Sequence, residues 1–416
     1  MFHKPPREFP TRIDPGERFR ERRRRHRRRI RNRRIVAIMT VVGLAAAIAF
    51  AFRAVSGGDQ GASETPAVPP APPPAAPAEL VVPPPSEPPA PAGPTVPLEI
   101  RGVHVSMQVL SLPGRLDKYL ALVSEGLNTL EVDVKDERGE VAFASPIAPL
   151  ATKIGSARGY YDPEGVAERI KAAGVYLIGR VVVFEDPWLT SEKPGLAIKN
   201  RGGGVWRDSA GYGWSNPYDE RVWKYNVDIA EAAARAGFDE IMFDYVRFPS
   251  DGNLKAMKFL RKQPETKSQT IARFLQFARN RLAPLDVRVS AAVFGLAATR
   301  DLGIGQDPRK LAPYLDAISP MVYPSHFGPG ELDIRNPAAA PGDIVSRALG
   351  DFNRVLRGQD TDIVPWLQDF TQNHRPYTLD DVRAQIGAAQ RRGAEGYLLW
   401  NSGALYTPGA LETGSR

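Results

Sequence analysis

Residues 236–252, "AGFDEIMFDYVRFPSDG", join two kinds of segment. Gly237 follows a long amphipathic stretch, which is typical of a glycine that stops a helix. The apolar run from Glu240 then predicts a buried strand, and this run acquires a carboxylate at Asp244 and a cation at Arg247 before Pro249 ends it. A helix feeding a buried strand with polar residues only at its far end is the repeating unit of parallel α/β folds.

The same alternation repeats along the chain. Further strand candidates begin at Gly102, Thr129, Tyr176, Val287, Ala317, Ile363 and Gly396. Amphipathic helix candidates occupy 116–127, 163–174, 221–237, 270–284 and 379–393. Eight strands alternating with helices predict a (β/α)8 TIM barrel, of class α/β. An open doubly wound sheet is the alternative, but no glycine-rich phosphate loop follows the first strand, and "GGG" at 202–204 is interpreted as a loop tip.

The N-terminal segment carries most of the positive charge. Residues 18–34 are mostly arginine, and without them the chain of net charge +8 is slightly acidic. An uncharged apolar run, 35–52, follows directly. As a helix it would be about 27 Å long, close to a bilayer core, and the preceding arginines predict a cytoplasmic N-terminus. We therefore predict a single-pass signal anchor, with a cleaved signal peptide or a nucleic-acid-binding arm as alternatives.

The composition divides the chain into five parts. Residues 1–34 are a cytoplasmic arginine-rich tail, 35–52 the anchor, 53–98 a Pro/Ala-rich linker, 99–406 the barrel domain and 407–416 a C-terminal tail. The linker cannot bury a core and is predicted to be disordered, as an extended polyproline spacer or as a tail with no function of its own. With no cysteine, the domain outside the cytoplasm must be stabilised by its own core.

Polar and aromatic residues gather where the predicted strands end, at the face on which barrel enzymes build their sites. They include His104, Asp133, Lys135, Glu185, Asp244, Arg247, Tyr323, His326, Trp366, Asp369 and Trp400. We expect Arg247 to keep Asp244 ionised, as part of a ligand pocket or as a structural pair bracing the barrel mouth.

Carboxylates and aromatic rings in one concave mouth favour glycoside hydrolysis, in which one acid protonates the leaving oxygen and a second attacks the sugar or activates water. The connection 186–217 is long for this position and contains Trp206 and Trp214. These two tryptophans are predicted sugar platforms, with loop packing as the alternative. Metal binding and a serine triad are disfavoured, since no HExxH or GxSxG motif occurs.

Six blocks resemble a TIM-barrel domain family of predicted glycoside hydrolases with unassigned function. They are 216–252, 127–143 ("LNTLEVDVKDERGEVAF"), 176–189, 318–327, 365–370 and 396–403. The resemblance covers residues 99–406 and implies the barrel fold and a carbohydrate-active role, without a substrate. The carboxylates Asp133, Glu185, Asp244 and Asp369 stand in matching blocks.

We predict a membrane-anchored extracytoplasmic glycoside hydrolase that acts on a cell-envelope or extracellular polysaccharide without cofactor or metal. By likeness to barrel glycosidases, Asp244 is the predicted nucleophile, with Asp369 first and Glu185 second as acid/base. A separation of ~5–5.5 Å between the two carboxyls predicts retention of configuration and ~6.5–9.5 Å predicts inversion.

The remaining residues are assigned to substrate binding: His104, Asp133, Lys135, Trp206, Trp214, Arg247, Tyr323, His326, Trp366 and Trp400. Two other classes stay open, a non-catalytic sugar-binding protein on an inactive barrel and a structural tether.

Overall fold

The computed structural model describes residues 95–261, 264–372 and 375–412. No helix within these residues is long and apolar enough to cross a membrane. The predicted tail 1–34 and anchor 35–52, and the linker as far as residue 94, lie outside the described residues.

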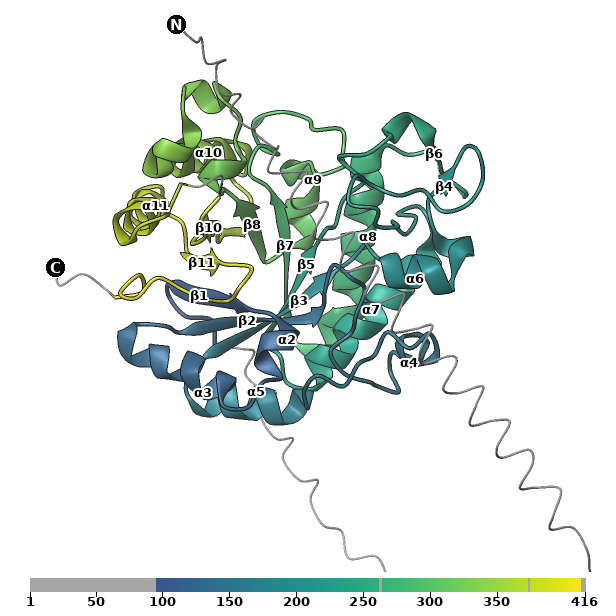
Figure 1. The fold of residues 1–416 in the computed structure, drawn as a ribbon, viewed down its shortest axis with the longest axis horizontal. Helices are drawn as coiled ribbons and strands as arrows, with labels where there is room; N and C mark the ends of the chain where they lie inside the picture. The colour runs from purple at the N-terminus through teal and green to yellow at the C-terminus, as the bar shows by residue number, and fades with distance from the viewer. Residues whose placement is uncertain (1–94, 262–263, 373–374, 413–416) are drawn as a thin grey trace, which may run out of the picture. The chain divides into compact units, whose positions relative to one another are not determined.

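Parallel strands close into a barrel surrounded by helices (Figure 1). Its strands are β1 (Ile100–Val105), β2 (Thr129–Lys135), β3 (Tyr176–Val182), β5 (Glu240–Asp244), β7 (Arg288–Phe294), β8 (Ala317–Met321), β9 (Asp362–Ile363), β10 (Trp366–Gln368) and β11 (Gly396–Trp400). β11 pairs with β1, and β8 pairs with both β9 and β10, so the described sheet has no open edge. The TIM-barrel prediction is confirmed.

The seventh barrel strand is split into β9 and β10 by Val364 and Pro365. Proline has no N–H for the strand ladder, which accounts for the break. The chain continues in the same direction, since Val364 N still donates to Ile318 O and Leu398 N to Pro365 O.

The helices lie outside the barrel. They are α2 (Met107–Leu110), α3 (Arg115–Leu120), α4 (Pro149–Lys153), α5 (Pro163–Ala172), α6 (Pro187–Glu192), α7 (Glu220–Arg235), α8 (Lys267–Leu282), α9 (Pro308–Leu311), α10 (Pro341–Val355) and α11 (Leu379–Arg391). Gly174 and Gly237 follow α5 and α7 with φ of +70° and +99°, the left-handed conformation expected of glycine at a helix end.

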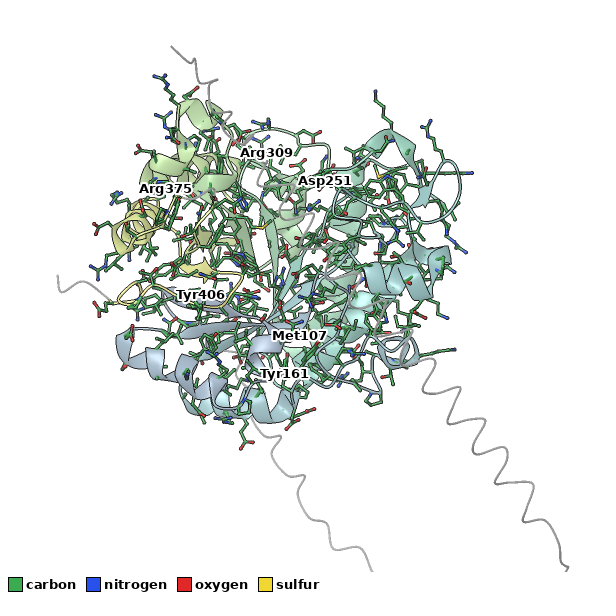
Figure 2. The ribbon with its side chains drawn as sticks, viewed as in Figure 1. Met107, Tyr161, Asp251, Arg309, Arg375 and Tyr406 are labelled. Atoms are coloured by element: carbon green, nitrogen blue, oxygen red, sulfur yellow. The ribbon has the colours of Figure 1, made fainter. Side chains whose placement is uncertain are left out.

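The buried apolar side chains form two clusters, a small one inside the barrel and a large one between sheet and helices. Figure 2 draws the side chains over the ribbon. The inner cluster includes Ile178, Met242 and Trp366. Because both faces of the sheet are covered, the strands are buried along nearly their whole length, as all-parallel sheets require. Residues 407–411 also pack on the barrel, with Leu411 buried.

Two long loops interlock beside the mouth between β3 and β5. The short strands β4 (Lys199–Asn200) and β6 (Met257–Lys258) pair antiparallel and join the loop after β3 to the loop after β5. Gly252 permits their close approach, because a Cβ there would lie 3.0 Å from the Asp208 backbone. These loops build one wall of the site.

Candidate active site

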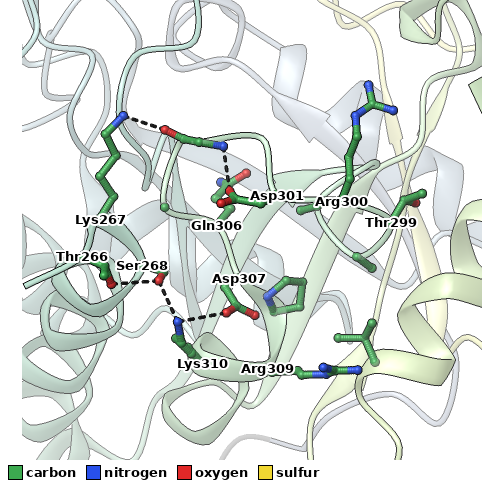
Figure 3. Close-up of a pocket in the computed structure, with 16 residues that line it drawn as sticks. Thr266, Lys267, Ser268, Thr299, Arg300, Asp301, Gln306, Asp307, Arg309 and Lys310 are labelled. Carbon is green, nitrogen blue, oxygen red and sulfur yellow. Dashed lines mark hydrogen bonds and ion pairs between the residues drawn. The ribbon is translucent and has the colours of Figure 1, made fainter.

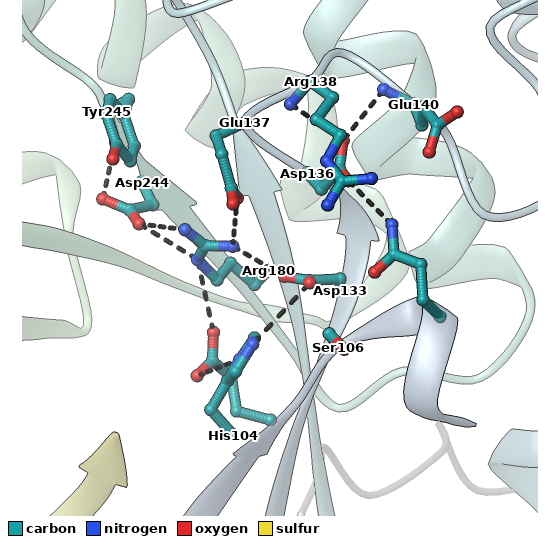
Figure 4. Close-up of polar contacts among 12 residues, drawn as sticks. His104, Ser106, Asp133, Asp136, Glu137, Arg138, Glu140, Arg180, Asp244 and Tyr245 are labelled. Atoms are coloured by element: carbon teal, nitrogen blue, oxygen red, sulfur yellow. Dashed lines mark hydrogen bonds and ion pairs between the residues drawn. The ribbon is translucent and has the colours of Figure 1, made fainter. Parts of the chain in front are cut away.

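Arg180, in the middle of β3, organises the polar centre of the barrel mouth (Figure 4). Its guanidinium donates from Nε and Nη2 to Asp244 Oδ2 at 3.0 and 2.6 Å, and from Nη1 to Asp133 Oδ1 at 2.7 Å. Carboxylate oxygens of Glu131 and Glu137 lie 3.9 and 3.8 Å from the guanidinium nitrogens. One buried cation therefore gathers four acidic side chains.

Asp244 is the last residue of β5, and its side chain is fixed on both oxygens. Oδ2 accepts from Arg180, and Oδ1 accepts from the backbone N–H of Tyr245 at 2.6 Å. Tyr245 has φ +49°, a left-handed conformation that is uncommon for residues other than glycine and recurs at functional sites. The carboxylate is thus held at a defined position at the end of the strand.

His104 on β1 bridges two acids of β2. Its Nδ1 lies 3.2 Å from Glu131 Oε2 and its Nε2 lies 3.6 Å from Asp133 Oδ2. Burial lowers the pKa of His104 to about 4, so the imidazole is neutral at pH 7. Burial also raises the pKa of Glu131 to about 8 and that of Asp133 to about 6.

Two stacked tryptophans close the mouth on the other side. The rings of Trp366 and Trp400 are 4.8 Å apart and nearly parallel, and Trp400 lies 4.1 Å from the His104 ring. Trp366 is 1% exposed, whereas Trp400 is half-buried. Trp400 is therefore the ring that can present a face to a sugar.

Tyr323 at the end of β8 has a buried hydroxyl without a hydrogen-bond partner in the described residues. Burial raises the pKa of Tyr323, and the next largest cause is the negative charge of Asp244. The hydroxyl therefore lies within electrostatic range of Asp244, and the described residues leave its hydrogen-bonding capacity unused. His326 packs edge-on against the Tyr323 ring, with centroids 5.2 Å apart.

Glu185, just beyond β3, is an acid whose pKa lies far above its ordinary value. Its side chain has no hydrogen-bond or ion-pair partner among the described residues, although the residue is only 7% exposed. Burial, followed by the charge of Asp208, raises the pKa of Glu185 to about 8. A carboxyl group that is protonated near neutral pH suits a general acid.

Glu185 and Asp244 belong to one electrostatic neighbourhood. Burial raises the pKa of Tyr245, and the next causes are the charges of Glu185 and of Asp244. Asp244 ends β5 and accepts from Tyr245 N, and Glu185 lies three residues beyond β3, the strand that pairs with β5.

Arg247 does not pair with Asp244, contrary to the sequence-based expectation. Its guanidinium lies over the rings of Trp214, Tyr245 and Phe294 at 4.7–5.0 Å and donates to Phe248 O. The cation beside Asp244 is Arg180, because Asp244 points into the barrel and Arg247 follows three residues later in the loop.

Lys135 faces away from the mouth, so the structure does not bring it to the predicted sugar subsite. Its ammonium group contacts Asp186 Oδ2 at 2.8 Å and Asn226 Oδ1, on α7, at 3.0 Å. The register of β2 against β3 shifts between Asp133 and Lys135. This bulge breaks the strict alternation that would have directed Lys135 inward with Asp133.

Trp206 and Trp214 are packing anchors, the alternative left open by the sequence. Each is 1% exposed and therefore has no face free for a sugar. Trp206 Nε1 donates to Asn253 O at 2.9 Å, and Trp214 Nε1 donates to Asp208 Oδ2 at 3.1 Å. The two buried tryptophans help to hold together the loops after β3 and β5.

Asp369 binds the C-terminal segment. Its two oxygens accept from Thr407 Oγ1 at 2.6 Å and from Thr407 N at 2.8 Å. It lines a cavity of about 280 Å³ with Asn401 and Tyr406, and no contact joins it to Arg180 or Asp244 in the described chain. Glu185 is thus better placed than Asp369 to act with Asp244.

A larger cavity, of about 540 Å³, lies between the start of α8 and the loop before α9 (Figure 3). None of the predicted site residues lines it. Its lysines are engaged locally, Lys267 with Gly303 O and Lys310 with Ser268 Oγ. The described residues contain no group of three His, Asp or Glu side chains placed to hold a metal ion.

Arg180 and Glu131 are central to the site but were not selected from the sequence. Arg180 is the only charged residue in "YLIGRVVV", and Glu131 alternates with Asp133 in "TLEVDV". A lone charge inside a buried strand was the available signal, since such a residue must find a partner in the barrel interior.

The comparisons with known proteins agree with the barrel. Residues 102–406 match a family described as "Putative glycosyl hydrolase domain". No curated protein matches the chain.

The similar solved structures include a glycoside hydrolase domain, a hypothetical protein and a mannanase. The glycoside hydrolase domain of PgaB (BpsB) from Bordetella bronchiseptica has 14% identity and a TM-score of 0.53, covering 74% of this chain and 95% of that one. A hypothetical protein from Ruminiclostridium thermocellum has 36% identity and a TM-score of 0.42, covering 45% and 96%. The endo-beta-1,4-mannanase from Thermotoga petrophila has 13% identity and a TM-score of 0.49, covering 73% and 67%. The likeness to the first of these supports the fold alone.

Proposed function

The chain belongs to the "Putative glycosyl hydrolase domain" family, and from this premise we propose that it cleaves a cell-envelope or extracellular polysaccharide with Asp244 and Glu185. Asp244 is the nucleophile and Glu185 the general acid and base. Asp369, the first candidate for the acid from sequence, is replaced in this proposal by Glu185.

One observation carries the proposal: two acids at neighbouring strand ends have opposite surroundings. Asp244 accepts hydrogen bonds from Arg180 and the Tyr245 N–H, whereas Glu185 has no partner and a pKa raised by burial to about 8. Two carboxyl groups whose environments differ in this way are suited to separate roles in glycoside hydrolysis.

The steps follow from these positions. The Asp244 carboxylate attacks the anomeric carbon while Glu185 gives its proton to the departing glycosidic oxygen, so the C–O bond breaks and an ester forms. The Glu185 carboxylate then takes a proton from water, whose oxygen attacks the anomeric carbon and releases Asp244. Trp400 supplies the apolar face for the sugar ring, and the Tyr323 hydroxyl binds a sugar oxygen near Asp244.

The N-terminal segment gives the proposed location. An apolar run at 35–52 behind an arginine-rich tail supports a single-pass anchor with a cytoplasmic N-terminus and an extracytoplasmic barrel. A Pro/Ala-rich linker at 53–98 would hold the barrel away from the membrane, within reach of envelope glycans.

The test compares wild type, Asp244→Asn and Glu185→Gln as full-length chains purified in detergent, on a panel of envelope polysaccharides and on aryl glycosides with good leaving groups. Asp244→Asn should lose activity on both classes. Glu185→Gln should lose activity on polysaccharides but keep the first step on aryl glycosides, which need no protonation. Retained polysaccharide cleavage by a folded Asp244→Asn variant would remove Asp244 from the mechanism; glycan binding without turnover by wild type would favour the non-catalytic alternative.

A further inference from the structure

Glu131 is a buried acid of the barrel interior to which the proposed mechanism gives no part. It lies on β2, and its carboxyl group makes one hydrogen bond within the described residues, between Oε2 and His104 Nδ1 at 3.2 Å. The other oxygen, Oε1, has no hydrogen-bond partner there. Because buried polar atoms nearly always have partners, this unpaired oxygen bears on whether the group is charged.

Arg180 does not compensate an ionised Glu131. Its Nε lies 3.9 Å from Glu131 Oε1, which is beyond hydrogen-bond distance. That nitrogen has a single hydrogen, and it donates this hydrogen to Asp244 Oδ2 at 3.0 Å. An ionised carboxylate would therefore keep one oxygen unpaired in the barrel interior, which is far more costly than leaving the carbonyl oxygen of a neutral acid unpaired. The geometry thus favours a neutral Glu131.

The groups packed around Glu131 agree with this state. Burial raises the pKa of Glu131 to about 8, although the charge of Arg180 on β3 opposes the rise and that of Asp244 on β5 adds to it. The hydroxyls of Tyr323, after β8, and Tyr406, in the C-terminal segment, also lie within electrostatic range of Glu131. At pH 7 Glu131 is therefore mostly protonated.

His104 lies between two acids and has one ring proton. Its Nε2 is 3.6 Å from Asp133 Oδ2 (Figure 4). Burial lowers the pKa of His104 to about 4, so near pH 7 only one of its two nitrogens carries a proton. Burial raises the pKa of Asp133 to about 6, which leaves it ionised at pH 7, and Arg180 Nη1 donates to its Oδ1 at 2.7 Å.

One arrangement of the protons satisfies both contacts of the ring. With the proton on Nδ1, the Nε2 lone pair would face the Asp133 carboxylate, and the O–H of Glu131 would have no acceptor within the described residues. With the proton on Nε2, the ring presents an N–H to Asp133, and Nδ1 accepts from the O–H of Glu131. The hydrogen bond at one ring nitrogen thus sets the state of the other.

We propose that Glu131 is a positioning residue: as a neutral acid it donates to His104 Nδ1 and thereby directs the Nε2–H at Asp133. Asp133 shares the guanidinium of Arg180 with Asp244, so the orientation of the imidazole helps to fix the cation that holds the Asp244 carboxylate. The consequence for catalysis rests on the proposed role of Asp244 as nucleophile. The placement of the protons does not depend on that role.

Two substitutions separate the donated hydrogen bond from the volume of the side chain. Glu131→Gln keeps an N–H that can donate to Nδ1, so kcat should stay within about threefold of wild type. Glu131→Met has a similar length but no donor, so the imidazole is held from one side only. For this variant kcat should fall about 10-fold or more while KM changes less than about threefold, because a displaced nucleophile slows the chemical step and leaves sugar binding intact.

The tautomer of His104 is measured by nitrogen NMR of the full-length chain in detergent, labelled at histidine. The His104 signals are identified by their loss in His104→Gln. At pH 7, wild type should show an unprotonated Nδ1 that accepts a hydrogen bond and a protonated Nε2, and Glu131→Gln should retain this pattern. In Glu131→Met the Nδ1 signal should move toward that of a nitrogen without a hydrogen bond. A residue that only stabilised the fold would not produce this difference between the two variants.

Glu240→Met is the matched control. Glu240 is a second buried acid inside the barrel, at the start of β5 and hence at the other end of that strand from Asp244. The Tyr176 hydroxyl donates to it at 3.1 Å. The substitution should lower the melting temperature, but the His104 signals and the kcat of the folded protein should not change.

The proton arrangement and the proposed function fail in different ways. A proton on Nδ1 of wild type at pH 7 overturns the arrangement. A wild-type kcat in Glu131→Met, or equal losses in Glu131→Gln and Glu131→Met, overturns the positioning role. If wild type cleaves no glycan, or if Asp244→Asn cleaves as well as wild type, the proposed function fails, and the NMR signals still uphold or overturn the arrangement.

Discussion

Arg180→Met is the substitution for which the structure predicts the largest loss of stability. Methionine keeps much of the length of the side chain but removes three hydrogen bonds, at 2.6, 2.7 and 3.0 Å, from a guanidinium that is 2% exposed. Asp244 and Asp133 then remain buried without a cation. Removing one partner of a buried ion pair costs about 3–5 kcal/mol of unfolding free energy.

The expected change in melting temperature follows from the size of the domain. At ~2.1 cal/mol/K per residue, a domain of ~300 residues has an unfolding entropy of ~0.6 kcal/mol/K, so the melting temperature should fall by about 5–8 °C. Calorimetry at pH 7.5 and pH 5 measures it. The deficit should shrink at pH 5, because protonating the stranded carboxylates removes their unpaired charge.

A matched control separates this effect from the loss of any arginine. Arg169 pairs with Asp117 on the surface, with both side chains more than half exposed. Arg169→Met should cost about 1 kcal/mol or less. If Arg180→Met melts at the same temperature as Arg169→Met, the reasoning that places Arg180 at the centre of the site is refuted.

Four further predictions test individual roles. Asp369→Asn should lower the melting temperature, because it weakens the bonds to Thr407, while kcat stays within about threefold of wild type; a loss of 100-fold or more would restore Asp369 as the acid. Lys135→Met should destabilise the fold but leave KM unchanged, as steady-state assays on the surviving folded protein would show. Trp400→Ala should raise KM at least ~10-fold through loss of the apolar sugar platform, and an unchanged KM would contradict that role. The rate of polysaccharide cleavage should fall as the pH rises past about 8, because Glu185 then loses its proton. The aryl glycoside activity of Glu185→Gln should not show this fall at high pH.

The barrel could be predicted because the patterns that indicate its strands and helices each lie within a short segment of the sequence. Each strand is a short apolar run, five of the eight are preceded by a predicted amphipathic helix, and glycines such as Gly174 and Gly237 mark helix ends. Even the seventh strand, interrupted at Pro365, was found, because the apolar residues on both sides keep its pattern.

The site was predicted only in part, because the direction of a side chain depends on register and neighbours. The structure brings His104, Asp133 and Asp244 together around Arg180. A bulge turns Lys135 outward, and sequence does not reveal a bulge of one residue.

Loop tryptophans are a second limit of sequence reasoning. Trp206 and Trp214 could be platforms or anchors on composition alone, and their burial depends on how the loops after β3 and β5 interlock. Arg180 was not predicted, because candidate residues were sought at the ends of strands and Arg180 lies in the middle of β3.

The most direct test of the central claim is to trap the glycosyl ester with a slow fluorinated substrate and to locate it by peptide mass spectrometry of the full-length chain. The proposed mechanism predicts a single added sugar on the peptide that contains Asp244, with accumulation slowed in Glu185→Gln for poor leaving groups. A sugar attached to Asp369 or to Glu185, or turnover without any adduct on Asp244, would contradict it.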